Sequence, residues 1–405
     1  MVSALWSFSQ QSFFLDSLLK ADLKKYSSIL KDPIKYRFQV VYTRIDRDRN
    51  NYPVFTDHYL NLTKNYIYPA STVKLPVSIL ALAKLKELNK AGLNDASCMI
   101  TDSAFFCQKK VLTDTSAQAG FPTLGNYIKK MFLVSDNAAF ARTYEFIGFD
   151  YMHAKLNELG YQNIRLLNRL DGQCAGDTAK VTPPVYFLAA NSDTIYKQAL
   201  THFTTKLTHP VKNSSAGRFH QGPHGKWLPG PRDFSAHNYM EITDLHRLMK
   251  QLVFNEFAKG SQQLPIDKDS RRLMLKALGQ YPRESDFPKY DKIYYDSFKK
   301  YFIYGSAVTT INGDSLRVIN IVGRAYGFLI DCAYIIDLKN NCEFLLTASV
   351  YVNENGRIGS GKYEYDQLGL PFFKDLGLSL YKYERQRKRL FRPDLEEFRT
   401  LFQKN

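Results

Sequence analysis

The chain has 405 residues, which is enough for one large domain or two modest domains with a sizeable buried core. Its aromatic fraction of 14%, spread over 27 Tyr and 28 Phe, argues against an intrinsically disordered protein. The formal charge of +16 suits an anionic cell-envelope polymer or lipid surface, although a solvated basic surface explains it equally well. Nucleic acid is not an expected partner, because no helix-turn-helix, zinc or RNA-binding signature accompanies the charge.

The first part of the chain is expected to supply a helix and the first strand of a sheet. Residues 1–14 lack a basic start and a long apolar core, so they are either a signal-peptide remnant or an N-terminal extension. Residues 12–33 carry apolar side chains at helical spacing, and residues 36–44 have the pattern of a strand, followed by a polar turn. No stretch approaches the roughly 18 apolar residues of a membrane span.

The next segment, Tyr68 to Pro76, places a serine and a lysine at the start of a helix. Ser71 and Lys74 are three positions apart, so their side chains lie on one helix face and the amine reaches the hydroxyl. Such a serine becomes a nucleophile when the lysine takes its proton, which requires a lysine with a lowered pKa. The free N–H groups at a helix start would also stabilise an oxyanion. A chance pair on a solvated helix face has the same spacing.

A second phrase, Ser135-Asp136-Asn137, follows 64 positions after Ser71 and precedes another helical pattern. By itself this phrase also fits a helix N-cap. In this order, the two phrases resemble the serine penicillin-recognising superfamily, and class A β-lactamases most closely. The resemblance implies an α/β (α+β) fold, in which an antiparallel sheet is flanked by helices and joined to an all-helical subdomain, here with an insertion.

The resemblance also assigns the parts of the chain to these two regions. Residues 15–68 and 315–405 would build the sheet domain, and residues 69–255, mostly helical in pattern, would hold both motifs. Residues 200–314 make the chain longer than a typical class A enzyme and form an insertion or extended region of uncertain structure. Within it, residues 286–304 are dense in Tyr, Phe and Lys and would wall the cleft or cover the sheet.

By analogy with the family, Ser71 attacks a carbonyl and Lys74 accepts its proton. Ser135 relays a proton to the leaving nitrogen, and Asn137 hydrogen-bonds the acyl amide. Asp171, in the phrase Arg169-Leu170-Asp171, stands where class A enzymes have the glutamate that activates the deacylating water. Its shorter side chain can misplace that water by about 1 Å, at a cost on the order of 10² in rate. Alternatively, Asp171 only holds its loop in place.

The family's third motif, Lys-Thr-Gly on a strand beside the nucleophile, is matched best by Ile321-Val322-Gly323, in the first of three strand-like runs. Ile321 and Val322 replace the lysine and threonine that bind the substrate carboxylate in the family, so efficient turnover of β-lactams is not expected. Gly323 is kept, and the backbone N–H of Arg324 would join that of Ser71 as an oxyanion donor. A rival match, Tyr304-Gly305-Ser306, lacks a strand pair directly after it.

The cysteines and histidines indicate neither a metal site nor a cofactor. Five cysteines are irregularly spaced and include no C-x-x-C pair. Cys98 and Cys107 either bridge a short loop in an oxidising compartment or remain buried free thiols. His220 and His224 are separated by Pro223, which favours a surface loop over a metal pair on one helix face.

The C-terminal region is expected to be a helix over residues 365–383 that packs on the N-terminal helix. Phe13 and Leu19 would meet Leu376 and Leu380. The following Arg/Lys run, which ends at Arg389, either contacts anionic lipid or is a solvated helix end.

These features predict a serine hydrolase that acts on an amide or ester, β-lactams included, through an acyl-enzyme at Ser71. The alternatives are a penicillin-binding D,D-peptidase-like enzyme that deacylates slowly and a catalytically retired binding protein of the cell envelope. The substrate would be a small molecule or peptide-like, and the location periplasmic or in the cell envelope. The sequence does not give the natural substrate or the oligomeric state.

Overall fold

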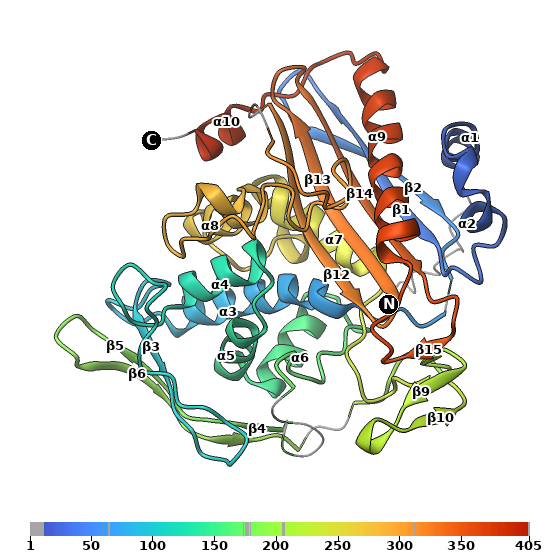
Figure 1. Cartoon of the computed structure of the whole chain (residues 1–405). Helices are drawn as coiled ribbons and strands as arrows, with labels where there is room; N and C mark the ends of the chain where they lie inside the picture. Colours follow the sequence, from blue (N-terminus) through green and yellow to red (C-terminus); the bar gives the residue numbers. More distant parts are fainter. Residues whose placement is uncertain are drawn as a thin grey trace, which may run out of the picture.

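A five-stranded antiparallel sheet organises the molecule. The computed structural model describes residues 12–403 apart from 64, 173, 175–177, 179, 205–206, 312 and 314. The strand order is β12-β13-β14-β1-β2, so strands from both ends of the chain are neighbours (Figure 1). The strands are β1 (Gln39–Arg47), β2 (Pro53–Leu60), β12 (Leu316–Ala325), β13 (Phe328–Asp337) and β14 (Cys342–Tyr351). The two or three strands expected between residues 316 and 352 are three, and the polar turn expected after the first strand lies at residues 48–52, but the strand β2 that follows this turn was not expected.

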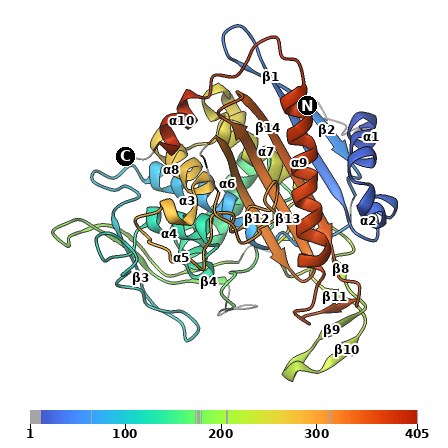
Figure 2. The ribbon, with the colours of Figure 1, turned by 45° about the horizontal axis from the view of Figure 1, so that its top comes forward.

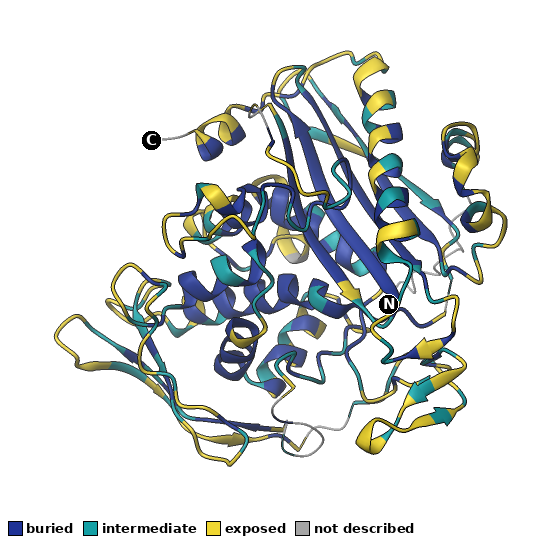
Figure 3. Cartoon of the chain, viewed as in Figure 1, coloured by how far each residue is buried: buried dark blue, intermediate teal, exposed yellow. Residues whose placement is uncertain are grey.

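Both faces of this sheet are covered, which is why its central strands are apolar on both sides. Along β13, Ile330, Cys332 and Tyr334 belong to one hydrophobic core, while Leu329 and Ile335 belong to a second core. This split follows from the period of two in a strand. Figure 3 shows β12, β13 and β14 buried along most of their length.

The terminal helices pack on the second core. They are α1 (Phe13–Asp22), α2 (Ser27–Lys31) and α9 (Leu370–Gln386). Leu19 joins Leu376 and Leu380 there, as expected. The expectation for Phe13 is wrong, since Phe13 is 83% exposed and its neighbour Phe14 instead lies 4.8 Å from the Tyr383 ring. The helix starts directly after its N-cap Ser12, whose hydroxyl accepts the Leu15 N–H.

The basic run at the end of α9 is a solvated helix end only in part, because Lys382, Arg385 and Lys388 are exposed whereas the side chains of Arg387 and Arg389 are buried. Arg387 donates to Glu384 Oε2 at 3.0 Å, and it also pairs with Asp46 at the end of β1. Arg389 pairs with the same Glu384 carboxylate. Because these guanidinium groups are buried against carboxylates, they fasten the chain to the sheet and present little charge to a lipid surface. The short helix α10 (Glu396–Phe402) follows.

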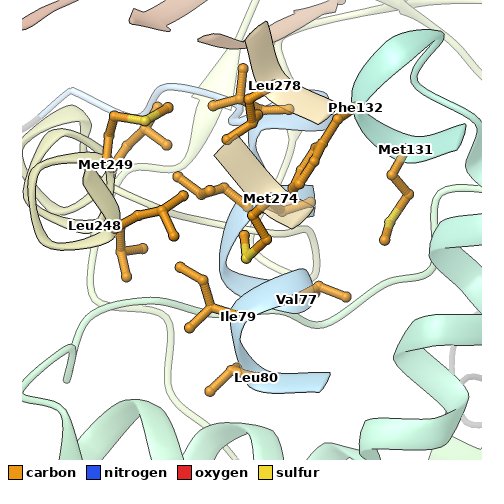
Figure 4. Close-up of a cluster of buried hydrophobic side chains, with 14 of the residues drawn as sticks. Val77, Ile79, Leu80, Met131, Phe132, Leu248, Met249, Met274 and Leu278 are labelled. Atoms are coloured by element: carbon orange, nitrogen blue, oxygen red, sulfur yellow. The ribbon is translucent and has the colours of Figure 1, made fainter. Parts of the chain in front are cut away.

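The first core joins the other face of the sheet to a group of helices. The helices are α3 (Lys74–Leu88), α4 (Leu124–Leu133), α5 (Asn137–Ile147), α6 (Phe149–Glu158), α7 (Ile242–Val253) and α8 (Lys268–Gly279). Helix α3 is apolar nearly all round and packs against α4, α5, α6 and α7, so it is the centre of this part. Figure 4 shows side chains of α3, α4, α7 and α8 meeting there: Val77, Ile79, Leu80, Met131, Phe132, Leu248, Met249, Met274 and Leu278.

The part of the chain that was expected to be all-helical, residues 69–255, also contains β-strands. A three-stranded sheet joins β3 (Cys98–Thr101), β5 (Val185–Leu188) and β6 (Thr194–Gln198), and a two-stranded pair joins β4 (Val181–Thr182) and β7 (Thr201–His202). Near the sheet domain, β9 (Phe219–Gln221) and β10 (Trp227–Pro229) form a hairpin that projects from the body beside β15 (Arg357–Ile358) (Figure 2). The expectation of mostly helical structure is therefore wrong between residues 181 and 233. His220 lies in this hairpin and contacts the Gly230 carbonyl.

The cysteine pairing differs from both alternatives. A disulfide joins Cys107 to Cys174, 67 positions apart, and Cys98 is free, as are the buried Cys332 and Cys342. This bond connects the loop after β3 to the loop that carries Asp171. The pairing was not readable from the sequence, because the two loops approach each other only after α4, α5 and α6 have packed. No helix within the described residues has the length and apolar character needed to cross a membrane.

Candidate active site

Ser71 lies in the 3₁₀ turn Ala70–Val73 that leads into α3. Ala70 adopts a left-handed conformation with φ 48°, and the Thr72 N–H and hydroxyl both donate to the Pro69 carbonyl. This conformation costs a non-glycine residue about 1–3 kcal/mol of free energy, so it persists only where surrounding contacts enforce it. Pro76 is the third residue of α3, and a proline in the first turn of a helix costs less than one in the helix interior. The turn therefore fixes Ser71 at the edge of the sheet with Lys74 one turn further on.

Lys74 is the centre of the site. Its side chain is fully buried, and its Nζ lies 2.9 Å from Ser71 Oγ, 2.8 Å from Ser135 Oγ and 2.7 Å from Asn137 Oδ1. The Ser135 carbonyl oxygen is 2.9 Å away. Ser135 Oγ in turn lies 2.8 Å from Ser71 Oγ. The four residues proposed from the two motifs are thus brought into one hydrogen-bonded group.

This arrangement of oxygens is compatible with a neutral amine. An ammonium has three N–H donors and no acceptor. The neutral amine can donate to the Ser135 carbonyl and to Asn137 Oδ1, and its lone pair accepts the Ser71 O–H. The Ser135 O–H then donates to Ser71 Oγ. This arrangement points the Ser71 proton at the group that would take it.

The environment of Lys74 favours the same protonation state. Burial lowers the pKa of Lys74 well below 10.5, and the positive charge of Lys299 lowers it further, against a smaller opposing effect of Asp136. Removing an ammonium from water disfavours its charged form unless a carboxylate pairs with it directly. Here the contacts are to hydroxyl, amide and carbonyl oxygens, so Lys74 is suited to act as a base.

The Ser135-Asp136-Asn137 phrase is both a helix cap and part of this group. Asp136 caps α5, because its side chain accepts the Ala139 N–H at 2.8 Å. Ser135, just before the cap, has φ 60°, which turns its hydroxyl and carbonyl toward Lys74. The two interpretations of the phrase are therefore compatible.

Strand β12 closes the other side of the nucleophile turn, as expected for the strand that carries Gly323. A Cβ atom at Gly323 would lie 2.5 Å from the Pro69 carbonyl oxygen and 3.3 Å from the Ala70 Cβ. Only glycine allows the strand and the turn to approach this closely. Val322 lines a pocket together with Ser135, and Arg324, next to Gly323, is exposed.

Asp171 lies in a buried cluster of charged side chains. Its carboxylate is 3.8 Å from Arg142 Nη2. Arg142 also lies 3.1 Å from Glu145, and Arg169 is 3.4 Å from the same glutamate. Burial raises the pKa of Glu145 to about 7, against the opposing effect of both arginines. Asp177, which resembles the later aspartate that pairs with the loop arginine in class A enzymes, lies outside the described residues.

One charged side chain of the site was not foreseen. Lys299 lines the same pocket as Ser135 and Val322, although it belongs to the connection between α8 and β12. In the sequence it is one of many lysines in the stretch 286–304, which was expected only to wall the cleft or cover the sheet. Phe298 and Lys299 do line the pocket, while Phe302 stacks on Phe373 of α9. The local sequence carries no signal that separates Lys299 from its neighbours.

Among the residues that the structure describes, no cluster of three or more His, Cys, Asp or Glu side chains could hold a metal ion. The residues around Ser71 suit acid–base and nucleophilic chemistry by protein groups.

Individual known proteins are at most distantly similar to this chain. A search of curated proteins finds no match. Among solved structures, a β-lactamase from Sphaerobacter thermophilus is 12% identical with a TM-score of 0.47, covering 92% of this chain and 98% of that one. A class A β-lactamase from Clostridium kluyveri is 12% identical with a TM-score of 0.47, and the match covers 89% of this chain and 100% of that one. PBP-A is 11% identical with a TM-score of 0.47, and the match covers 92% of this chain and 98% of that one.

The sequence model of the beta-lactamase enzyme family matches residues 56–383, which is most of the chain and includes Ser71, Lys74, Ser135 and Gly323. The antiparallel sheet built from both ends of the chain, with helices on its two faces, has the architecture that the resemblance implied. The chain therefore belongs to the beta-lactamase enzyme family, and it is a β-lactamase-like serine hydrolase.

Proposed function

We propose that this protein cleaves an amide or ester bond through an acyl-enzyme on Ser71, with Lys74 as the base. The observation that carries the proposal is the fully buried Lys74 amine within hydrogen-bonding distance of Ser71, Ser135 and Asn137. A buried amine without a carboxylate partner, beside a hydroxyl, has the geometry and the protonation state of a nucleophile–base pair.

The steps follow from the hydrogen bonds. Ser71 Oγ attacks the substrate carbonyl while its proton passes to Lys74 Nζ. The tetrahedral oxyanion is stabilised by the backbone N–H groups of Ser71 and Arg324. The proton then reaches the leaving nitrogen or oxygen through Ser135 Oγ, which lies 2.8 Å from both Ser71 Oγ and Lys74 Nζ. Asn137 Nδ2 remains available to an acyl amide, because Asn137 Oδ1 faces Lys74. Water releases the acyl group.

The proposed substrate is a small molecule or peptide-like compound, and the proposed location is the periplasm or the cell envelope. The Cys107–Cys174 disulfide supports an oxidising compartment. The formal charge of +16 is compatible with anionic envelope polymers.

The charged cluster around Asp171 favours a second candidate, a D,D-peptidase-like enzyme that acylates readily and deacylates slowly. Asp171 and Glu145 share Arg142, so this carboxylate has a structural ion-pair role available to it. A carboxylate engaged in this way is a weaker activator of water than a free one. The two candidates share the acylation step and differ only in the lifetime of the acyl-enzyme.

Labelling with a fluorophosphonate, followed by intact-protein mass spectrometry, tests the proposal. Wild-type protein should gain one label, and Ser71→Ala should gain none. Ser78→Ala is the matched control, because Ser78 lies on the same helix, is fully buried and has no hydrogen-bond partner for its Oγ. Equal labelling of Ser71→Ala and Ser78→Ala would place the nucleophile elsewhere.

Asp171→Asn separates the two roles considered for this carboxylate. If Asp171 activates water, we expect an unchanged acylation rate and an acyl-enzyme that persists at least about 10-fold longer, since general-base groups contribute about 10²–10⁴-fold. The measurement is the decay of the acyl-enzyme mass after excess penicillin is removed. An unchanged lifetime combined with a lower Tm would show instead that Asp171 only stabilises its loop through Arg142.

A further inference from the structure

The connection between α9 and α10 exposes two neighbouring apolar side chains. Leu390 is 89% exposed, and Phe391 beside it is exposed as well. Both lie in the sequence Lys388-Arg389-Leu390-Phe391-Arg392, so basic residues stand on either side of them. A single exposed leucine is ordinary on a protein surface, whereas adjacent exposed apolar residues within a basic segment indicate a surface that meets a partner.

Both ends of this connection are fixed to the hairpin of β1 and β2. Before the two apolar residues, Arg387 pairs with Asp46 at the end of β1. After them, the Asp394 N–H donates to Asn51 Oδ1 in the turn of the hairpin at 3.0 Å. Figures 1 and 2 both show the connection running beside the tip of this hairpin. The two apolar residues are therefore exposed in a segment that is anchored on both sides.

The hairpin adds apolar surface next to the connection. Tyr52, which follows Asn51, is exposed, and its ring lies 5.4 Å from the ring of Phe257, which is exposed as well. Figure 3 shows exposed residues over much of the connection that passes this tip. We call this surface the end patch, and it consists of Tyr52, Phe257, Leu390 and Phe391.

The charge around the end patch is positive. Residues 382–394 contain six basic residues and two acidic ones. Two of the six, Arg387 and Arg389, are buried against Glu384 and do not contribute to the surface charge. The exposed cations are Lys382, Arg385, Lys388 and Arg392, joined by Arg49 at the tip of the hairpin.

Most carboxylates near the end patch are engaged by protein groups. Glu384 lies buried between two arginines, and Asp46 pairs with Arg387. Asp48 accepts two backbone N–H groups of its own turn at 2.8 and 2.9 Å. Asp394 is exposed, and it is the single exposed carboxylate between residues 382 and 394. The net charge presented by this segment is therefore cationic.

We propose that the end patch docks on an anionic lipid bilayer, with Leu390 and Phe391 among the acyl chains and the surrounding cations at the headgroups. Apolar side chains between lysines and arginines match this partner, because a bilayer offers hydrocarbon directly beneath an anionic surface. A soluble polyanion matches the charge but not the apolar side chains. A second copy of this chain matches the apolar side chains but repels through its charge. This proposal is independent of the function proposed above.

Docking at this end directs the active site away from the bilayer. The register of the sheet places the C-terminal end of β1 at the same end as Leu316, the first residue of β12. Gly323, which abuts the nucleophile turn, is seven positions after Leu316 and thus roughly 23 Å further along the strand. Ser71 would therefore face the surrounding solution while the protein is bound to lipid.

Cosedimentation with lipid vesicles tests the apolar half of the proposal. Wild-type protein should partition onto vesicles of phosphatidylcholine with phosphatidylglycerol at least about 10-fold more strongly than onto pure phosphatidylcholine. Leu390→Gln should lower the partition coefficient on the anionic vesicles by about 10-fold, since one apolar side chain no longer enters the lipid. Phe106→Gln is the matched control, because Phe106 is 88% exposed in the loop after β3, and it should bind as wild-type protein does.

A pair of double variants tests the charged half. Lys388→Gln combined with Arg392→Gln should lower the partition coefficient by about 10- to 30-fold, as expected for two cations near an anionic surface. Lys212→Gln combined with Lys226→Gln changes the net charge equally, and both lysines are exposed outside the end patch. This control should bind at close to the wild-type level. An equal loss in both double variants would overturn the proposal, since the attraction would then belong to the whole basic surface.

Three other results would also overturn it. The first is equal partitioning of wild-type protein onto neutral and anionic vesicles, or no binding to either. The second is a Leu390→Gln protein that binds like wild type while the variant of Lys388 and Arg392 does not, which would identify an anionic polymer as the partner. The third is a dimer in sedimentation velocity that Leu390→Gln abolishes, which would identify a second copy of the chain. Labelling of Ser71 by fluorophosphonate should be the same in every variant.

Discussion

Replacing Lys74 by arginine is expected to lower the acylation rate of Ser71 by about 10²–10⁴-fold. The reason is that an arginine side chain does not lose its proton in a protein, so it keeps the charge at this position but is unable to accept the Ser71 proton. Arginine is also always cationic in a site whose burial and whose Lys299 charge disfavour a cation. The rate of acylation by penicillin, followed as the mass of the intact protein against time, measures the effect.

The pH dependence of the wild-type rate belongs to the same prediction. Because the neutral amine is the active form and the pKa of Lys74 is lowered, acylation should rise with pH through that lowered pKa and then level off. Lys84→Arg is the matched control on the same helix. Lys84 donates to the Phe146 and Ile147 carbonyls at 2.7 and 2.9 Å, away from Ser71, so this variant should acylate at close to the wild-type rate. A Lys74→Arg protein that acylates at the wild-type rate would show that another group is the base.

Gly323→Ala is expected to reduce acylation by about 10²-fold or more. The new methyl group would lie 2.5 Å from the Pro69 carbonyl oxygen and 3.2 Å from Thr72 Cγ2. The Pro69 carbonyl does not move freely, because it already accepts from the Thr72 N–H at 3.1 Å and from the Thr72 hydroxyl at 2.7 Å. Strand β12 must therefore shift away from the turn, and a displacement of about 1 Å at a reacting centre costs on the order of 10² in rate.

The acylation rate constant of Gly323→Ala, measured beside its thermal unfolding, checks this expectation. A folded variant with a slow reaction is the expected result, since the clash is confined to the contact between the turn and the strand edge. If the folded variant reacts as fast as wild-type protein, then the spacing between β12 and Ser71 does not govern acylation, and the proposed oxyanion donor at Arg324 loses its support.

The sequence by itself determined the features that depend on local geometry. The three-residue spacing of Ser71 and Lys74 on a helix brings the amine to the hydroxyl, and Lys74 Nζ lies 2.9 Å from Ser71 Oγ. The apolar runs from residue 316 to 352 predict two or three adjacent antiparallel strands, and they form β12, β13 and β14. Residues 242–254 carry a clear helical pattern and form α7. In each case the physical cause acts within a few residues of the chain.

Strand β2 shows where that local information ends. Strand β2 is only partly buried, and the polar Thr56, Asp57 and His58 interrupt its apolar residues, so the sequence shows no clear strand pattern there. Its place in the sheet comes from pairing with β1 and from Asp57 accepting from Lys250 of α7 at 2.8 Å. The sheet β3-β5-β6 was missed for a similar reason, since its strands are short and β3 pairs with β5 from more than 80 positions away.

Only the tertiary structure decided the remaining features, because each depends on groups that are distant in the sequence. Cys107 is bonded to Cys174, 67 positions away, because the packing of α4, α5 and α6 brings their two loops together. Arg387 is buried because Glu384 and Asp46 meet it at the end of the sheet. Lys299 comes to the pocket of Ser135 because Lys300 and Asn320 anchor its segment on β12. Charge and burial at these positions are properties of the assembled fold, and no local pattern of residues encodes them.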